Sequence, residues 1–529
     1  MQKADDRREP AKNLLVEFDV LVTVCQHLGQ MQGGRLENRR CGSPIVDLGY
    51  AQYQGVANSE TGNTEFLGLR YAAPPTGTKC PLALPEAVDG LQMADTQPNR
   101  CQQAPERGTP GRLMMRPVSE DCLFLNVVIP GLDFSSTTTK KLPVVVWIHG
   151  GGYALGSISK PGLSSMRIYD GNDLVNDSGG KVISVLIQYR LGLFGFLAGE
   201  DVKNNGVLNA GLRDQQFALE WIQRHISKFG GDPEQVTIWG QSRHLIANGG
   251  KTNPPLFRAA MLSSAFLPSQ YPYNASVPEN AHDRLECLRD TDLADLREVN
   301  AKVAEQALYG TFAFVPVVDG DFIRESPIQA LRRGRLNSEH VLAVVNTYEG
   351  RMFVDPETRG SVDVRDYLPK LFPMFRGNQI HLALTLYENL GDPFEQVIQI
   401  MEMNLSAIFV CPTYYILKSL KGKGFKAVFA IPPGDHIDDI LYFFPSITPA
   451  GVPPFNNTAL FMDFVRNGDP NVKSAGSILP HWPKWNRWHR KEVVFNRTGD
   501  VPDIRTAMTE QALLERCEFW ESTKKWTGQ

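Results

Sequence analysis

The chain of 529 residues has no long apolar run and no excess of one charge. No stretch of eighteen apolar residues occurs, so the sequence contains no segment that could span a bilayer. With 54 Lys and Arg against 58 Asp and Glu, the net charge is only −4. This balance gives no electrostatic reason to expect nucleic acid or an anionic membrane surface as a partner. An apolar content of 42% is ordinary for a globular protein with a large core.

Closely spaced cysteine pairs are also missing. The eight cysteines include no C-x-x-C pair, which removes support for a zinc ribbon or a thioredoxin-like site. Cys101 and Cys122 lie in a stretch rich in Pro and Gly. They are either a loop-closing disulfide of an oxidising compartment or two buried thiols. Five N-x-[ST] sequons favour secretion only weakly, because a long chain collects a few by chance; they begin at Asn176, Asn274, Asn404, Asn456 and Asn496.

The first 43 residues differ in composition from the rest. Residues 1–13 are highly charged, and Glu17 and Asp19 interrupt the apolar run that follows, so no clear signal peptide is present. We expect residues 1–43 to be a poorly ordered N-terminal extension. Residues 44–529 contain no linker rich in Pro, Gly or Ser, so we expect one large domain with long loop excursions.

Short apolar runs alternate with helical patterns through the rest of the chain. Between residues 209 and 228, apolar side chains recur at helical spacing, and Gly230-Gly231 ends the pattern. A continuous apolar run of strand length occurs at 142–148, and further strand candidates, mostly apolar, lie at 123–129, 182–187, 236–239, 341–345 and 427–431. Buried strands that alternate with helices predict an α/β fold with a mostly parallel central sheet flanked by helices.

Residues 230–242 have the layout of a nucleophile elbow, in which a strand turns sharply and presents a serine. The usual pattern is G-x-S-x-G, but this chain has Gly240-Gln241-Ser242-Arg243-His244 and therefore lacks the second glycine. A serine hydroxyl needs a base, usually a histidine oriented by a carboxylate, before it can act as a nucleophile.

The glycines of His149-Gly-Gly-Gly-Tyr153 follow the apolar run 142–148. Consecutive glycines after a strand leave backbone N–H groups unobstructed, as an oxyanion hole requires. The alternatives are a plain flexible turn or a phosphate cradle. A phosphate loop would continue with Lys and Ser or Thr, whereas this one continues Tyr153-Ala-Leu-Gly. The order of this motif and the downstream elbow favours the oxyanion hole.

Several motifs together resemble the type-B carboxylesterase/lipase family, the cholinesterase-like branch of the α/β-hydrolases, with a likeness to fungal secreted lipases. They occur in family order from about residue 44 onward, at 119–127, 147–153, 188–192, 209–215, 229–233, 346–350 and 464–471. On their own, Glu349 could be a surface carboxylate, and His436 is one of ten histidines.

The resemblance assigns roles to these residues. It implies a catalytic triad of Ser242, Glu349 and His436, in the chain order of α/β-hydrolases. It also implies that Gly151, Gly152 and Arg243 supply the N–H groups of the oxyanion hole, and that Cys101 pairs with Cys122.

The sequence departs from the family pattern after Ser242. The family continues with small residues that begin a helix, and here about two turns of that helix are missing, roughly 7 residues. We interpret this as an internal deletion or a splice error in the gene model, and we expect His244 to clash at the elbow; the alternative is a tolerated variant. Ile437 stands where a glycine is common, Cys80 is unexplained, and Cys287 is expected to be unpaired.

These features predict a carboxylic-ester hydrolase that forms an acyl-enzyme and needs no metal or cofactor, and whose activity we expect the shortened elbow to impair. A small-molecule or lipid ester is the expected substrate, and the resemblance and the sequons suggest secretion. The alternative is a catalytically inactive, cholinesterase-like binding or adhesion protein. Such relatives commonly lose triad members, whereas all three residue types are present here.

Overall fold

A computed structural model describes residues 44–75, 83–104, 118–132, 140–159, 169–240, 242–275, 285–404, 409–447, 458–473, 480–499 and 501–529. The proposed extension 1–43 and Cys80 lie outside the described residues.

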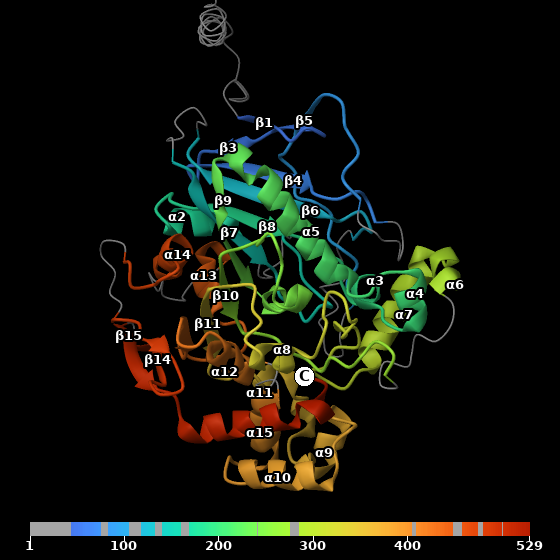
Figure 1. Cartoon of the computed structure of the whole chain (residues 1–529), viewed down its shortest axis with the longest axis vertical. Helices are drawn as coiled ribbons and strands as arrows, with labels where there is room; N and C mark the ends of the chain where they lie inside the picture. Colours follow the sequence, from blue (N-terminus) through green and yellow to red (C-terminus); the bar gives the residue numbers. More distant parts are fainter. Residues whose placement is uncertain are drawn as a thin grey trace, which may run out of the picture.

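One twelve-stranded sheet organises the chain (Figure 1). Its order is β15-β14-β12-β11-β10-β9-β7-β8-β6-β4-β3, with β13 beside β12. The strands from β14 to β8 in this order are parallel, and antiparallel strands complete both edges. The sheet strands are β3 (Val56–Asn58), β4 (Asn63–Arg70), β6 (Phe124–Pro130), β7 (Leu142–Ile148), β8 (Ile183–Ile187), β9 (Gly231–Gly240), β10 (Ala259–Ser263), β11 (His340–Asn346), β12 (Gly424–Phe429), β13 (Lys484–Trp485), β14 (Lys491–Thr498) and β15 (Val501–Met508). The predicted α/β fold is confirmed.

Alternation along β7 explains why these strands read as continuous apolar runs. Val144 and Val146 face one hydrophobic core, and Val145 and Trp147 face the other. Because both faces of the central sheet are covered, side chains that point to either face are buried, as Val144–Ile148 are. The helix predicted over 209–228 is α5 (Ala210–His225), which belongs to the first core.

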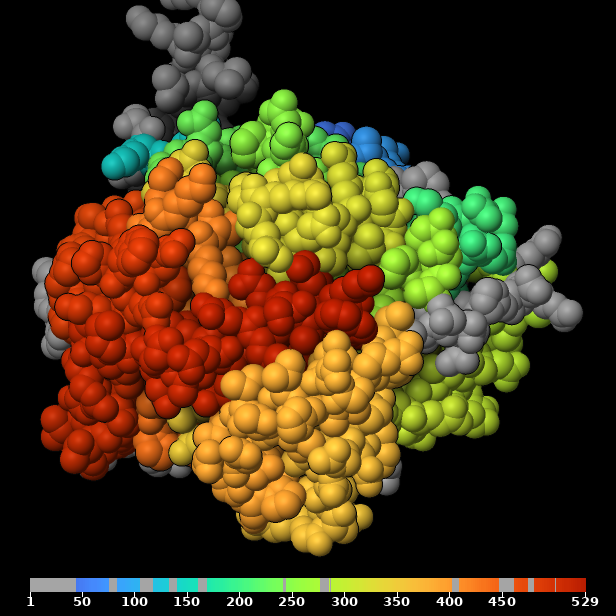
Figure 2. Space-filling model, turned by 60° about the horizontal axis from the view of Figure 1, so that its bottom comes forward, coloured from blue at the N-terminus to red at the C-terminus, as the bar shows by residue number. Residues whose placement is uncertain are grey.

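The remaining helices lie around the sheet, with α4, α6 and α7 off to one side of it (Figure 1). In Figure 2, α15 lies between the α9–α11 region and β14–β15. These remaining helices are α2 (Gly171–Asp177), α3 (Gly192–Phe196), α4 (Glu200–Asn205), α6 (Leu285–Asp290), α7 (Leu293–Gln306), α8 (Pro327–Arg332), α9 (Val364–Leu371), α10 (Gly377–Tyr387), α11 (Pro393–Asn404), α12 (Val410–Ser419), α13 (Ile440–Phe443), α14 (Thr458–Asn467) and α15 (Gln511–Thr527). A small sheet of β1 (Ile45–Asp47), β2 (Gln52–Gln54) and β5 (Leu91–Met93) precedes β6. Within the described ranges, no helix is both long and apolar enough to cross a bilayer.

Two disulfides link the described residues. Cys101 and Cys122 are bonded, with Cα atoms 5.0 Å apart, which confirms that pairing. A second disulfide joins Cys411 on α12 to Cys517 on α15, and sequence reasoning missed it. No local spacing could reveal it, because 106 positions separate the two cysteines and connectivity cannot be deduced from sequence alone. Cys287 is free and exposed, as expected.

Candidate active site

The structure brings together two residues of the expected triad, His436 and Glu349. Glu349 follows the carboxyl end of β11 and is fully buried. Its Oε2 accepts a hydrogen bond from Nδ1 of His436 at 2.5 Å. A carboxylate in this position fixes the tautomer of the imidazole, leaving the proton on Nδ1 and the lone pair on Nε2.

The second oxygen of Glu349 is held as firmly as the first. Oε1 accepts bonds from the Ser264 hydroxyl and from the backbone N–H of Asn346, each at 2.7 Å. A buried carboxylate with both oxygens bonded has little freedom to rotate, so Glu349 fixes the orientation of the His436 ring. Ser264 lies in no motif that the sequence marks, and Asn346 opens the motif 346–350 but no role was assigned to it.

A second buried carboxyl group, that of Asp439, lies next to Asn346. Asp439 Oδ1 accepts a bond from the Asn346 side-chain amide at 3.1 Å. Burial, and next the negative charge of Glu349, raise the pKa of Asp439 to about 6. Asp439 was also missed by sequence reasoning, although it lies only three positions after His436.

Aromatic rings and a strained residue complete the surroundings of His436. The ring centroids of Phe409 and Phe353 lie 4.5 and 5.1 Å from that of His436. The next residue, Ile437, has φ = +73°, a region that β-branched side chains avoid and glycine tolerates. The unusual isoleucine noted in the sequence therefore occupies a position where the backbone favours glycine.

The glycine loop after β7 requires its glycines. Gly151 and Gly152 have φ values of +113° and +64°. A Cβ on Gly151 would lie 2.1 Å from the Leu155 carbonyl oxygen, and one on Gly152 would lie 1.8 Å from the Phe312 ring. Among the described residues, neither glycine N–H has a hydrogen-bond acceptor. Two free N–H groups in a fixed loop form an arrangement that can receive an oxyanion.

His149 anchors this loop rather than entering the chemistry. It is buried, its ring stacks on Tyr189 with centroids 4.4 Å apart, and its carbonyl accepts a bond from the Tyr189 hydroxyl at 2.7 Å. Burial lowers the pKa of His149 to about 4. The ring is therefore neutral at physiological pH.

Ser242 is placed by its backbone alone. It is the first residue of a 3₁₀ turn, η4 (Ser242–Leu245), just beyond β9. The side chains of Ser242 and Arg243 lie outside the part of the chain that the structure describes. Because β9, β11 and β12 are parallel, the segments that carry Ser242, Glu349 and His436 all leave the sheet at one edge.

Comparison with known protein families gives a match over most of the chain. A model of the carboxylesterase family matches residues 42–243 and 268–520, well over half of the chain. The chain belongs to the carboxylesterase family.

Relatives of this carboxylesterase-family chain include fungal enzymes. It is 29% identical to a secreted lipase of Arthroderma benhamiae, over 76% of this chain and 82% of that protein. It is 27% identical to the carboxylesterase patB of Penicillium expansum, over 91% of this chain and 96% of that protein. The crystal structure of Aspergillus niger EstA has a TM-score of 0.78, with 28% identity over 92% of this chain and 99% of that one.

The family match stops at residue 243 and resumes at 268, where the sequence departs from the pattern. Between β9 and β10 the described residues contain no α-helix, only η4 and a second 3₁₀ turn, η5 (Ala247–Gly249). Connections between parallel strands usually contain a helix. This carboxylesterase-family chain thus lacks the helix that a nucleophile elbow normally begins.

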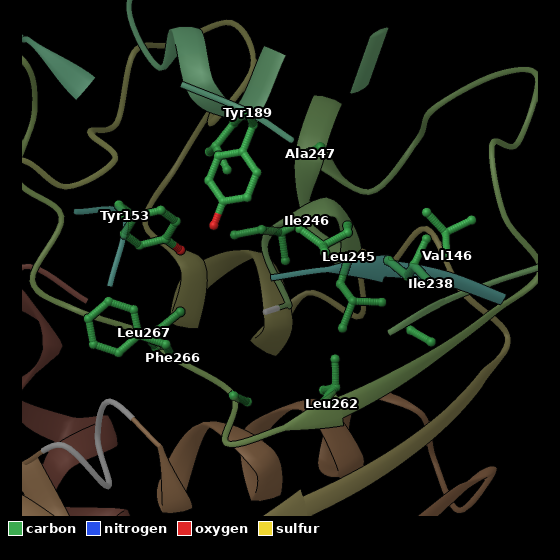
Figure 3. Close-up of a cluster of buried hydrophobic side chains, with 14 of the residues drawn as sticks. Val146, Tyr153, Tyr189, Ile238, Leu245, Ile246, Ala247, Leu262, Phe266 and Leu267 are labelled. Carbon is green, nitrogen blue, oxygen red and sulfur yellow. The ribbon is translucent and has the colours of Figure 1, made fainter. Parts of the chain in front are cut away.

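The expectation that His244 would clash at the elbow is wrong. The chain after Ser242 makes a 3₁₀ turn instead of a helix, and this turn gives the imidazole a place in the core. His244 is buried, and its Nε2 donates to the Gln215 side-chain oxygen at 2.9 Å. Burial lowers the pKa of His244 to about 4. Leu245 and Ile246 follow it into the core beside Val146 and Ile238 (Figure 3). The shortened segment is packed against the sheet, with His244 as its polar anchor.

Proposed function

We propose that this protein is a carboxylic-ester hydrolase in which Ser242, His436 and Glu349 form the catalytic triad. The observation that carries the proposal is the hydrogen bond between buried Glu349 and His436, at the edge of the sheet where Ser242 follows β9. Membership of the carboxylesterase family supports it, as do the N–H groups of Gly151 and Gly152, for which the described residues offer no acceptor.

The reaction proceeds in two steps. Nε2 of His436 accepts the Ser242 proton while Oγ attacks the ester carbonyl, because Nδ1 is engaged by Glu349. The N–H groups of Gly151, Gly152 and Arg243 stabilise the oxyanion. His436 then protonates the leaving alcohol, and an acyl-Ser242 remains. Water, deprotonated by His436, attacks the acyl carbon, and the acid departs as Ser242 regains its proton. No metal or cofactor takes part.

The walls of the site favour an apolar acyl group. A line of aromatic rings runs from Gly152 to His436, with centroid distances of 5.2 Å from Phe312 to Phe266, 5.2 Å from Phe266 to Phe409 and 4.5 Å from Phe409 to His436. A cavity of about 800 Å³ adjoins Phe266 and Phe312. A small-molecule or lipid ester fits such a lining, and a nucleic acid does not.

We also propose that the protein acts outside the cell. One relative is a secreted lipase, and the two disulfides suit an oxidising compartment.

The rate of this chain is expected to be low. Without a helix after Ser242, the elbow loses the helix N-terminus behind the oxyanion hole and the support that positions Oγ. A misplacement of about 1 Å can cost on the order of 100-fold in rate. The loss of one oxyanion donor adds roughly 3–4 kcal/mol to the barrier.

Covalent labelling distinguishes an enzyme from a binding protein. A fluorophosphonate should label the purified chain and spare Ser242→Ala, and it should spare His436→Ala because the base is gone. Equal labelling of all three would reject Ser242 as the nucleophile. An unlabelled chain, still unlabelled after the missing segment is restored, would favour the cholinesterase-like binding or adhesion protein.

Insertion of a small-residue segment after Ser242 tests the impairment. We expect turnover of p-nitrophenyl butyrate to rise by about 100-fold or more. The matched control carries Ser242→Ala within the inserted chain and should be inactive. If the chain without the insertion hydrolyses p-nitrophenyl butyrate at ordinary esterase rates, on the order of 10 per second, the shortened elbow is tolerated and the impairment is rejected.

A further inference from the structure

The turn between β13 and β14 presents an exposed indole. Trp488 is 76% exposed, more than any other large apolar side chain of the described residues. The Asn486 side-chain oxygen accepts bonds from the backbone N–H groups of Trp488 and His489, each at 2.9 Å, and so fixes the turn. The Arg487 guanidinium lies 4.5 Å from the centre of the indole. A rigid turn therefore holds the ring in solvent beside a cation.

Further cations gather around this turn. Lys484 lies on β13, and Arg490 and Lys491 lead into β14. Lys423 reaches the same place from the turn before β12, because Gly424 pairs with Trp485. The residues that we call the Trp488 patch are Trp488, Met508, Lys423, Lys484, Arg487, Arg490 and Lys491.

Met508 adds a second apolar group to the patch. It is 60% exposed and pairs directly with Lys491 across β14 and β15. Two exposed carboxylates border the patch: Glu339 just before β11, and Glu510 next to Thr509, whose N–H bonds the Arg490 carbonyl. When Glu515, which Gln511 links to Arg490, is also counted, the five cations leave a local charge of +2, although the whole chain carries −4.

We infer that the Trp488 patch binds the surface of an anionic phospholipid bilayer. Indole rings favour the interface between lipid and water, and a thioether next to one adds apolar area to bury. Lysine and arginine beside them are attracted to anionic headgroups. The net charge of the chain gave no reason to expect this partner, because an average over 529 residues does not reveal seven that lie together.

The patch and the catalytic residues lie on opposite edges of the sheet. Lys423 precedes the amino end of β12 and Lys491 begins β14, whereas Glu349 follows the carboxyl end of β11. These strands are parallel. A molecule bound through the patch therefore keeps Glu349 and His436 on the side away from the lipid. The binding is independent of the proposed ester hydrolysis.

Co-sedimentation with vesicles tests the inference without any need for activity. We expect the full chain to sediment with vesicles of phosphatidylcholine that contain about a third phosphatidylserine, and at least about tenfold less with phosphatidylcholine alone. Each basic residue near an anionic surface contributes roughly a fivefold factor, so Lys484→Gln with Lys491→Gln should weaken binding about 25-fold. Arg487→Gln with Trp488→Ala should weaken it by about 50-fold.

The chain offers a matched control at the catalytic edge. Arg351 lies 4.1 Å from the centre of the half-exposed Tyr348 ring, the same pairing of arginine and aromatic as in the patch. Arg351→Gln with Tyr348→Ala should leave vesicle binding unchanged. A loss of vesicle binding in this control as large as in Arg487→Gln with Trp488→Ala would overturn the inference. So would binding that ignores lipid charge, no binding to either vesicle, or binding to heparin without binding to vesicles.

Discussion

The two halves of the candidate site differ in how they are built. On the histidine side, Glu349 has both carboxylate oxygens bonded and His436 is held between it and two aromatic rings. On the serine side, the helix that should begin at the elbow is replaced by 3₁₀ turns, and a buried histidine anchors them. The Glu349–His436 pair is therefore well supported by its neighbours, whereas the described residues after Ser242 lack the helix that usually follows an elbow serine.

The largest effect is expected on the histidine side. Glu349→Gln keeps the size of the side chain but loses the charge and favours the wrong imidazole tautomer, so kcat should fall by about 10³ to 10⁴-fold. The measurement is turnover of p-nitrophenyl butyrate, in the chain with the restored segment if the written chain is too slow. Exposed Glu357→Gln is the control. A fall in kcat of less than about tenfold would mean that Glu349 does not take part in the proposed proton transfer.

On the serine side, His244→Ala should lower the free energy of unfolding by about 2–4 kcal/mol, because it leaves Gln215 unpaired in a cavity. The pKa of His244 is lowered from 6.5 to about 4, so its contribution is complete above pH 6.5 and lost as pH falls toward 4. Urea unfolding at pH 7 and pH 4.5 measures both effects, and the variant should lose less stability on acidification. A more stable His244→Ala would restore the idea of a clash at the elbow.

Asp439 should affect the pH dependence of stability in the opposite direction from His244. Its pKa is raised from 3.8 to about 6, so the folded state is penalised above pH 6 and relieved as pH falls toward 4. Asp439→Asn removes the buried charge and should raise the free energy of unfolding by about 2 kcal/mol at pH 7, with little gain at pH 4. Asp435→Asn, which removes a carboxylate paired with Arg351 instead, serves as the control. Destabilisation at both pH values would show that the charge supports the site.

The smallest effect concerns the backbone after His436. Ile437→Gly relieves the left-handed conformation, whereas Ile437→Ala removes similar packing and keeps the strain. The glycine variant should therefore be more stable than the alanine variant by about 1 kcal/mol. Thermal unfolding of the pair gives the difference. Equal stabilities would mean that the strain at this position carries no measurable cost.

Much of the fold could be predicted because local signals sufficed. The strand β7, the strand β8 and the second half of β9 are mostly apolar runs, and the glycines after β7 mark the loop proposed as the oxyanion hole. Ser264, Asn346 and Asp439 escaped prediction because their roles depend on contacts across the sheet. The buried position of His244 was missed for a related reason. Predicting it required knowing that the shortened chain would turn toward Gln215.

The bond between Cys411 and Cys517 has a consequence for the order in which the covalent framework is completed. Cys101 meets its partner 21 positions later, so that ring can close while most of the protein is still being made. Cys411 must remain a thiol until 106 further residues have followed, including the whole of β12, the His436 loop and β14. During that interval it can attack the finished Cys101–Cys122 bond by thiol–disulfide exchange. Oxidative folding of this chain should therefore depend more strongly on an isomerase that corrects such mispairing than it would with the first disulfide alone.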